Sequence, residues 1–125
     1  MQKLNIEASK YTPQIIMDAE LGLIEMNGKS YPENTFEFYK PVIEWLEEYF
    51  QNPKETTTLN MEIIYFNSSS SKLFFDLFDL LEEHTEDSQI IIYWIYDEEN
   101  ESAEEAGEDF IEDFENLNIQ LQVKA

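Results

Sequence analysis

The chain has 125 residues, of which 28 are acidic and seven are lysine, so its formal net charge at pH 7 is −21. This balance excludes a nucleic-acid binder, which needs a basic surface for phosphates, and a protein that docks on anionic membranes. Disorder is excluded as well, because 42% of the residues are hydrophobic and 14% are aromatic, whereas disordered acidic chains lack aromatics. We therefore expect one folded acidic domain over residues 1–125.

Missing sequence features limit the chemistry and the location. The chain has no cysteine, which excludes disulfides, thiolate metal sites and a thiol nucleophile. The first residues lack the apolar core of a signal peptide, and no apolar run approaches the roughly 20 residues of a membrane span. We expect a cytoplasmic protein that uses no cofactor.

The negative charge is concentrated in the second half of the chain. Residues 1–72 contain 11 acids and six lysines, whereas residues 73–125 contain 17 acids and a single lysine, Lys124. Lys72 is therefore the last cation before a long acidic stretch.

The first half of the chain predicts a hairpin followed by a helix. Residues 12–29 indicate a hairpin with its turn at residues 18–22, and Asn27-Gly28 near the end of this segment is a second turn signal. Residues 34–51 carry apolar side chains at three- and four-residue steps, with Asn34 or Thr35 as the N-cap. Pro41 should kink this helix, because it removes a backbone hydrogen bond. The apolar positions of this helix are Phe36, Tyr39, Ile43, Leu46 and Phe50.

The second half predicts alternating strands and helices. Residues 57–66 indicate a strand, and a helix should follow from about Ser69 to His84. Residues 90–96 are the most apolar stretch and predict a central strand covered on both faces. Residues 97–115 contain 11 acids around a helical apolar stripe, and residues 118–123 alternate like an edge strand. The order ββαβαβαβ predicts an α/β fold with about three helices and a mixed, mostly parallel sheet that begins with a hairpin.

The run Ser68-Ser69-Ser70-Ser71 lies where a strand ends and a helix begins. One of these serines is the expected N-cap, and the unpaired N–H groups of a helix N-terminus favour a bound or attached phosphate. Lys72 lies one turn into the helix and can pair with such a phosphate. A capping serine in a polar turn is the simpler interpretation of the run.

Other patterns indicate enzymes or metal sites more weakly. Ser69 and Lys72 match the S-x-x-K nucleophile motif, so a small acidic serine hydrolase is an alternative, although the companion motifs are missing. The acids of 97–102 lack the glycine of a calcium loop, and His84 has no second histidine, so we predict no metal site. A third possibility is an acidic mimic of nucleic acid that binds a basic protein.

Several segments together resemble the SiaC family of regulatory phosphoproteins. The most specific are Ser30-Tyr31-Pro32-Glu33-Asn34 and the run from Tyr65 to Lys72, Tyr-Phe-Asn-Ser-Ser-Ser-Ser-Lys. Thr12-Pro13, Trp45-Leu46, Tyr93-Trp94 and Gly107-Glu108-Asp109-Phe110 extend the resemblance over nearly the whole chain.

This resemblance implies a fold similar to STAS domains and a non-enzymatic role in a bacterial partner-switching circuit. A cognate kinase would phosphorylate the hydroxyl after Asn67, which is Ser68 here, with Ser69 as the next candidate. A metal-dependent phosphatase would remove the phosphate. The unphosphorylated form would activate a diguanylate cyclase and so promote biofilm formation or aggregation. The residues expected to face partners are Asn67, Ser68, Ser69, Ser70, Lys72 and the loop Tyr31, Pro32, Glu33 and Asn34.

Overall fold

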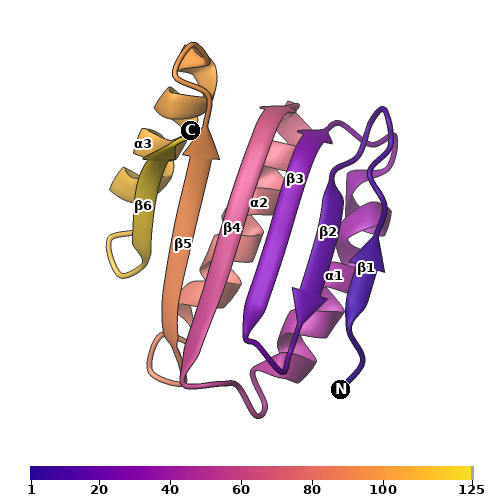
Figure 1. Cartoon of the computed structure of the whole chain (residues 1–125), viewed down its shortest axis with the longest axis vertical. Coiled ribbons are helices and arrows are strands. Elements are labelled where there is room, and N and C mark those ends of the chain that lie inside the picture. The colour runs from indigo at the N-terminus through magenta and orange to yellow at the C-terminus, as the bar shows by residue number, and fades with distance from the viewer. Residues whose placement is uncertain (125) are drawn as a thin grey trace.

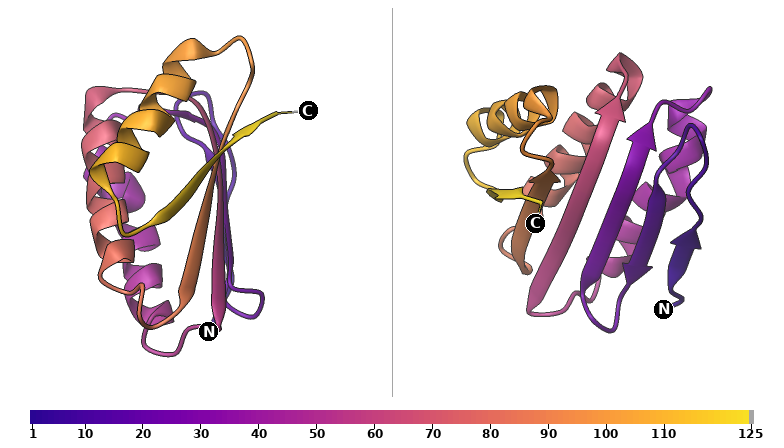
Figure 2. Two further views of the ribbon diagram at one scale, coloured as in Figure 1. Left: turned by 90° about the vertical axis from the view of Figure 1, so that its left-hand side faces the viewer. Right: turned by 45° about the horizontal axis from the view of Figure 1, so that its top comes forward.

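The computed structural model describes residues 1–124 as a six-stranded sheet with three helices packed on one face (Figures 1 and 2). The edge-on view in Figure 2 shows all three helices on the same side of the sheet. The strands are β1 (Leu4–Ile6), β2 (Gln14–Asp18), β3 (Leu23–Ser30), β4 (Thr56–Phe66), β5 (Gln89–Tyr96) and β6 (Asn118–Val123). The helices are α1 (Thr35–Tyr49), α2 (Ser68–Glu82) and α3 (Glu101–Asp113).

The sheet is mixed and mostly parallel, as predicted. Its strands lie in sequence order from β1 to β6, and β3, β4, β5 and β6 run parallel to one another. The predicted hairpin is formed by β2 and β3, and β6 lies at an edge as expected. The carboxyl ends of the parallel strands therefore meet at one edge, and each of the three helices begins there.

Strand β1 is an addition to the predicted order. It has only three residues and pairs antiparallel with β2, with Leu4 opposite Met17 and Ile6 opposite Ile15. Three residues are too few to show an alternating pattern, so no periodicity marked this segment as a strand.

The expectation that β5 is covered on both faces is wrong. Ile92, Trp94 and Tyr96 are buried under the helices, whereas Ile91 and Tyr93 on the opposite face stay half-buried. No helix within residues 1–124 covers that second face. A run of apolar residues therefore signals the strand correctly but does not establish a second layer.

Two local predictions in the first half are also wrong. Asn27-Gly28 is not a turn, because β3 continues through it to Ser30 with a bulge between Gly28 and Lys29. Gly28 has φ +134°, a backbone conformation that other residues rarely adopt. Pro41 does not interrupt its helix, since α1 runs from Thr35 to Tyr49 without a break.

Helix α3 lies close to the sheet because a glycine faces a tryptophan. The Trp94 indole Nε1 donates a 2.8 Å hydrogen bond to the carbonyl oxygen of Ala103, which fixes the ring beneath the helix. Gly107 is buried one turn further along α3. A Cβ atom at Gly107 would lie 2.6 Å from Cδ1 of Trp94 and 2.5 Å from Cδ2 of Leu121. The missing side chain sets the distance between α3 and the sheet.

Gly107→Ala should therefore destabilise the fold, although alanine favours helices. We expect a loss of about 1 to 2 kcal/mol in the free energy of unfolding, because overpacking costs more than helix propensity returns. Urea denaturation measures this change. Ser102→Ala, at an exposed position of the same helix, is the control and should shift stability by less than about 0.5 kcal/mol. Equal stability of Gly107→Ala and the wild type would contradict this account of the packing.

Candidate functional site

The three helices begin at the carboxyl edge of the sheet, and each has an asparagine as its N-cap. Asn34, Asn67 and Asn100 are the N-caps of α1, α2 and α3. In each case Oδ1 accepts a hydrogen bond from the backbone N–H three residues further on, at 3.1, 2.9 and 3.1 Å respectively. These bonds satisfy one of the free N–H groups at each helix N-terminus.

The serine run starts α2 but does not cap it. The prediction of a serine N-cap is wrong, because Asn67 occupies that position and Ser68 is the first helical residue. Ser68 and Ser69 are exposed, and Asn67 is half-buried. The hydroxyl of Ser68 is therefore free of a structural role at the helix N-terminus and open to solvent.

The prediction that Ser70 faces a partner is wrong. It is fully buried, and its Oγ lies 2.8 Å from the Oγ of Ser30 at the end of β3. The Ser30 hydroxyl is in turn 2.5 Å from the hydroxyl of Tyr39 in α1. Burial raises the pKa of Tyr39 to about 12, against the opposing effect of its hydrogen bond with Ser30, so this phenol stays protonated. The role of Ser70 is to join α2 to β3 and α1.

The loop from Tyr31 to Asn34 lies beside the serine run. Both segments were predicted to face partners, and a single partner can contact both only if they are neighbours. The backbone N–H of Asn67 donates a 3.1 Å hydrogen bond to the carbonyl oxygen of Ser30, which links the two strand ends. Glu33 and Asn34 are exposed, whereas Pro32 is buried and contributes to the loop's shape rather than to its surface.

Tyr31 belongs to a row of three tyrosines at this edge. Its ring meets Tyr11 edge-on at 5.2 Å between centroids and Tyr65 at 5.6 Å. Tyr11 and Tyr65 are about half exposed. The prediction did not include either of them, because one comes from the β1–β2 connection and the other from the end of β4.

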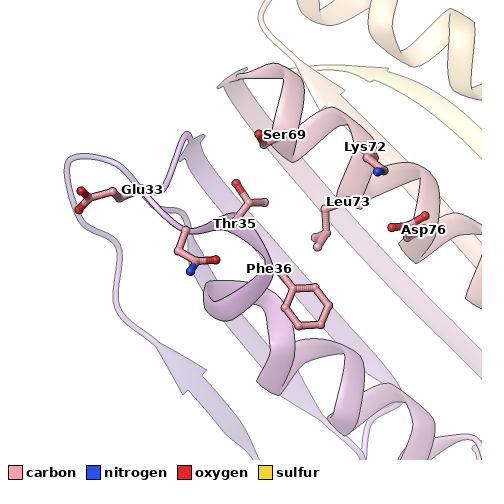
Figure 3. A pocket seen from close by; sticks show the side chains of 8 residues that line it. Glu33, Thr35, Phe36, Ser69, Lys72, Leu73 and Asp76 are labelled. Atoms are coloured by element: carbon pink, nitrogen blue, oxygen red, sulfur yellow. The ribbon is translucent and has the colours of Figure 1, made fainter.

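A hollow of about 430 Å³ lies between the first turns of α1 and α2 (Figure 3). We call it the α1–α2 groove. It brings together four residues predicted to face partners, Glu33, Asn34, Ser69 and Lys72. It also contains four that the prediction did not assign to the site, namely Thr35, Phe36, Leu73 and Asp76.

Phe36 is the most exposed large apolar side chain of this groove. The sequence assigned it to the buried face of its helix, but it is 72% exposed and its ring projects into the space between α1 and α2 (Figure 3). The buried stripe of α1 begins at Tyr39 instead. An aromatic residue at the first turn of a helix is the available sequence signal, and it does not distinguish a core position from a surface one.

The helical layer is strongly acidic. The three helices carry 14 acids and two lysines, Lys40 and Lys72, whereas the six strands carry three acids and one lysine. Within residues 1–124, Lys124 forms an ion pair with Glu62 at 2.9 Å, and His84 lies 2.8 Å from Asp87, a contact that is an ion pair only when the histidine is protonated. Neither helical lysine is therefore held by an acid.

Two further observations concern metals and membranes. Across the described residues 1–124, no three histidine or acidic side chains converge as a metal site. The side chain of His84 forms a 2.8 Å hydrogen bond with Asp87 and stacks on Phe50, with 4.4 Å between the ring centroids. None of the helices in this part of the chain has the length and apolar character that crossing a bilayer requires.

Comparison with known proteins places this architecture. The family model described as "SiaC family regulatory phosphoprotein" matches residues 6–124. An uncharacterized protein of Pseudomonas aeruginosa strain UCBPP-PA14 is 38% identical over 114 residues, which cover 90% of each chain. The solved structure of SiaC of Pseudomonas aeruginosa is 34% identical, with a TM-score of 0.89 over 99% of this chain and 100% of that one.

A second solved structure contains a complex. It is the crystal structure of the diguanylate cyclase SiaD with its activator SiaC from Pseudomonas aeruginosa, 35% identical with a TM-score of 0.89. The match covers 97% of this chain and 99% of that one. Since the family model and the solved relatives each cover nearly all of the chain, the resemblance noted in the sequence is confirmed, and the protein belongs to the SiaC family of regulatory phosphoproteins.

Proposed function

We propose that this protein is a non-enzymatic switch whose phosphorylation on Ser68 controls its binding to a diguanylate cyclase. The observation that carries the proposal is the exposed Ser68 hydroxyl at the first position of α2, beside the α1–α2 groove. The family is described as one of regulatory phosphoproteins, which supports regulation by phosphorylation. The related SiaC forms a complex with the diguanylate cyclase SiaD, which supports a cyclase as the effector. The whole chain acts as one domain in this proposal.

Phosphorylation at this position changes the surface rather than the fold. A phosphate adds about −1.5 to −2 charge and three acceptor oxygens, and a helix N-terminus tolerates such an anion. The cap of α2 is made by Asn67 and the buried contact by Ser70, so neither depends on the Ser68 hydroxyl. A partner that packs over Ser68 would have to desolvate the phosphate and would lose affinity.

The circuit also needs enzymes that add and remove the phosphate. We propose a cognate serine kinase and a metal-dependent serine phosphatase, both acting on Ser68 in the cytoplasm. The cyclase is active while the switch is unphosphorylated, which links the state of Ser68 to cyclic diguanylate synthesis and to biofilm formation or aggregation. Asn67, Ser69, Lys72, Glu33 and Asn34 lie around Ser68 or along the groove, where each of these partners can reach them.

The central experiment compares the wild type, Ser68→Ala and protein phosphorylated on Ser68, each titrated against a SiaD-like diguanylate cyclase from the same organism. Wild type and Ser68→Ala should bind and activate the cyclase alike, whereas phosphorylation should weaken binding by about tenfold or more. Ser69→Ala is the matched control, and mass spectrometry should still find its phosphate on Ser68. Equal affinity of all forms would refute the proposal.

The same titration separates the switch from an acidic mimic of nucleic acid. If binding rested on bulk charge, it would fall steeply with salt and ignore the state of Ser68. We expect the opposite pattern, with a modest dependence on salt and a strong dependence on phosphorylation.

The groove brings Ser69 and Lys72 to one surface, so the serine-hydrolase alternative is tested directly. A fluorophosphonate probe should leave the wild type unlabelled, because neither residue is buried in a way that would activate a nucleophile. Covalent labelling that disappears in Ser69→Ala would establish a catalytic serine and contradict the non-enzymatic role.

A further inference from the structure

We propose that Lys72 transmits the state of Ser68 to the α1–α2 groove by neutralising Asp76 only while Ser68 is unphosphorylated. The groove itself receives an apolar side chain of the effector protein. This inference rests on the function proposed above and names the residues that couple the phosphate to the partner. It is built from the spacing of three side chains on α2 and from the exposure of Phe36.

The groove has the features of a site for a single apolar anchor. Phe36 lies on the α1 side of the groove and is 72% exposed, and Leu73 contributes an apolar side chain from α2. Aromatic side chains, including phenylalanine, are enriched in the cores of protein interfaces. The hollow of about 430 Å³ can take one large side chain.

The charges of the groove are arranged along one face of α2. Ser68, Lys72 and Asp76 follow at steps of four residues, so the Lys72 ammonium lies one turn from each of the other two side chains. Lys72 and Asp76 both line the groove, and Figure 3 shows them on neighbouring turns. Lys72 is the one lysine of α2 and belongs to none of the ion pairs found in residues 1–124. In the unphosphorylated chain its ammonium therefore offsets the charge of Asp76 from the neighbouring turn without a fixed contact, and it can move toward a phosphate on Ser68.

The Lys72 ammonium would interact more strongly with a phosphate on Ser68 than with Asp76, for two reasons. The phosphate's charge of about −1.5 to −2 exceeds that of a carboxylate. The phosphate is also better placed, because it is N-terminal to Lys72, and a helical ion pair is stronger when the anion is N-terminal to the lysine than when it is C-terminal. Phosphorylation therefore moves the Lys72 ammonium toward the N-terminus of α2 and away from the groove.

The loss of Lys72 leaves Asp76 without a counter-charge at the place where the anchor docks. Covering an unpaired carboxylate with an apolar side chain costs more than covering one whose charge is offset by a nearby ammonium, because nothing then compensates its desolvation. Binding is thereby weakened at the groove, in addition to any direct contact between the phosphate and the partner.

The effector is further defined by the charge of the helical layer. Helices α1 and α2 together carry seven acids against two lysines, so the surface around the groove fits a partner that carries lysine or arginine beside its apolar anchor. Each attraction between exposed charges contributes little and is screened over about 8 to 10 Å. The affinity gained when a phosphate attracts basic side chains of the partner is therefore smaller than the affinity lost at the groove.

The first test needs the phosphorylated protein but no partner. Titration of phosphoserine 68 by ³¹P NMR should show that Lys72→Gln raises the second pKa of the phosphate and that Asp76→Asn lowers it. Lys40→Gln removes the same charge from α1 and should leave this pKa unchanged. Identical titrations of wild type and Lys72→Gln would overturn the proposed pairing.

The second test uses unphosphorylated protein and the cyclase that binds the wild type. Lys72→Gln should weaken binding by about tenfold, like phosphorylation, and Lys72→Gln combined with Asp76→Asn should recover affinity to within about threefold of the wild type. Asp79→Asn, an exposed acid of α2 outside the groove, should not rescue Lys72→Gln. Failure of Asp76→Asn to rescue would overturn this inference.

The two inferences fail in distinguishable ways. If phosphorylation weakens wild-type binding but the Lys72 and Asp76 variants behave like the controls, the switch stands and its route through Lys72 is refuted. If Lys72 shifts the pKa of the phosphate while cyclase binding ignores Ser68, the ion pair stands and the proposed function is refuted.

Discussion

A row of three buried hydroxyls at the carboxyl edge of the sheet holds the functional surface together. Ser30 lies at its centre, 2.5 Å from the Tyr39 hydroxyl of α1 and 2.8 Å from the Ser70 hydroxyl of α2. A buried hydroxyl that loses its partner costs about 1 to 3 kcal/mol, so neither helix can shift at this end without a penalty. Phe36 lies three residues before Tyr39, and Ser68 lies two before Ser70. The groove and Ser68 therefore take their relative positions from these two hydrogen bonds.

The parts of the fold that could be predicted are those with a repeating pattern. Three helices, the hairpin and the parallel strands follow from apolar periods of two and of three to four residues, because burial of one face imposes them. Strand β1 was too short to repeat, and β5 has an apolar run that says nothing about which face is covered. At the site, the sequence identified the serine junction and the loop at Glu33 and Asn34. It could not show that Ser70 is buried or that Phe36 is exposed, because both depend on how α1 and α2 pack, and these two residues are 34 positions apart in the chain.

The acids of the helices and strands are divided unevenly between the two layers. The strands hold three acids and one lysine, and the helices hold 14 acids and two lysines, so like charges are spread over the solvent side of the outer layer. Screening weakens their mutual repulsion there. The same division makes the total charge a poor guide to function, since one ammonium at Lys72 determines the balance within the groove while the remaining acids form a general background.

The choice of asparagine for all three helix caps has a consequence for acid conditions. Aspartate caps helices equally well, and this chain uses acidic residues freely elsewhere, yet Asn34, Asn67 and Asn100 cannot be protonated in the range where carboxylates titrate. The start of each helix therefore keeps its cap when the pH falls. This edge of the sheet therefore keeps its shape in acid, even where the charges around it are titrated.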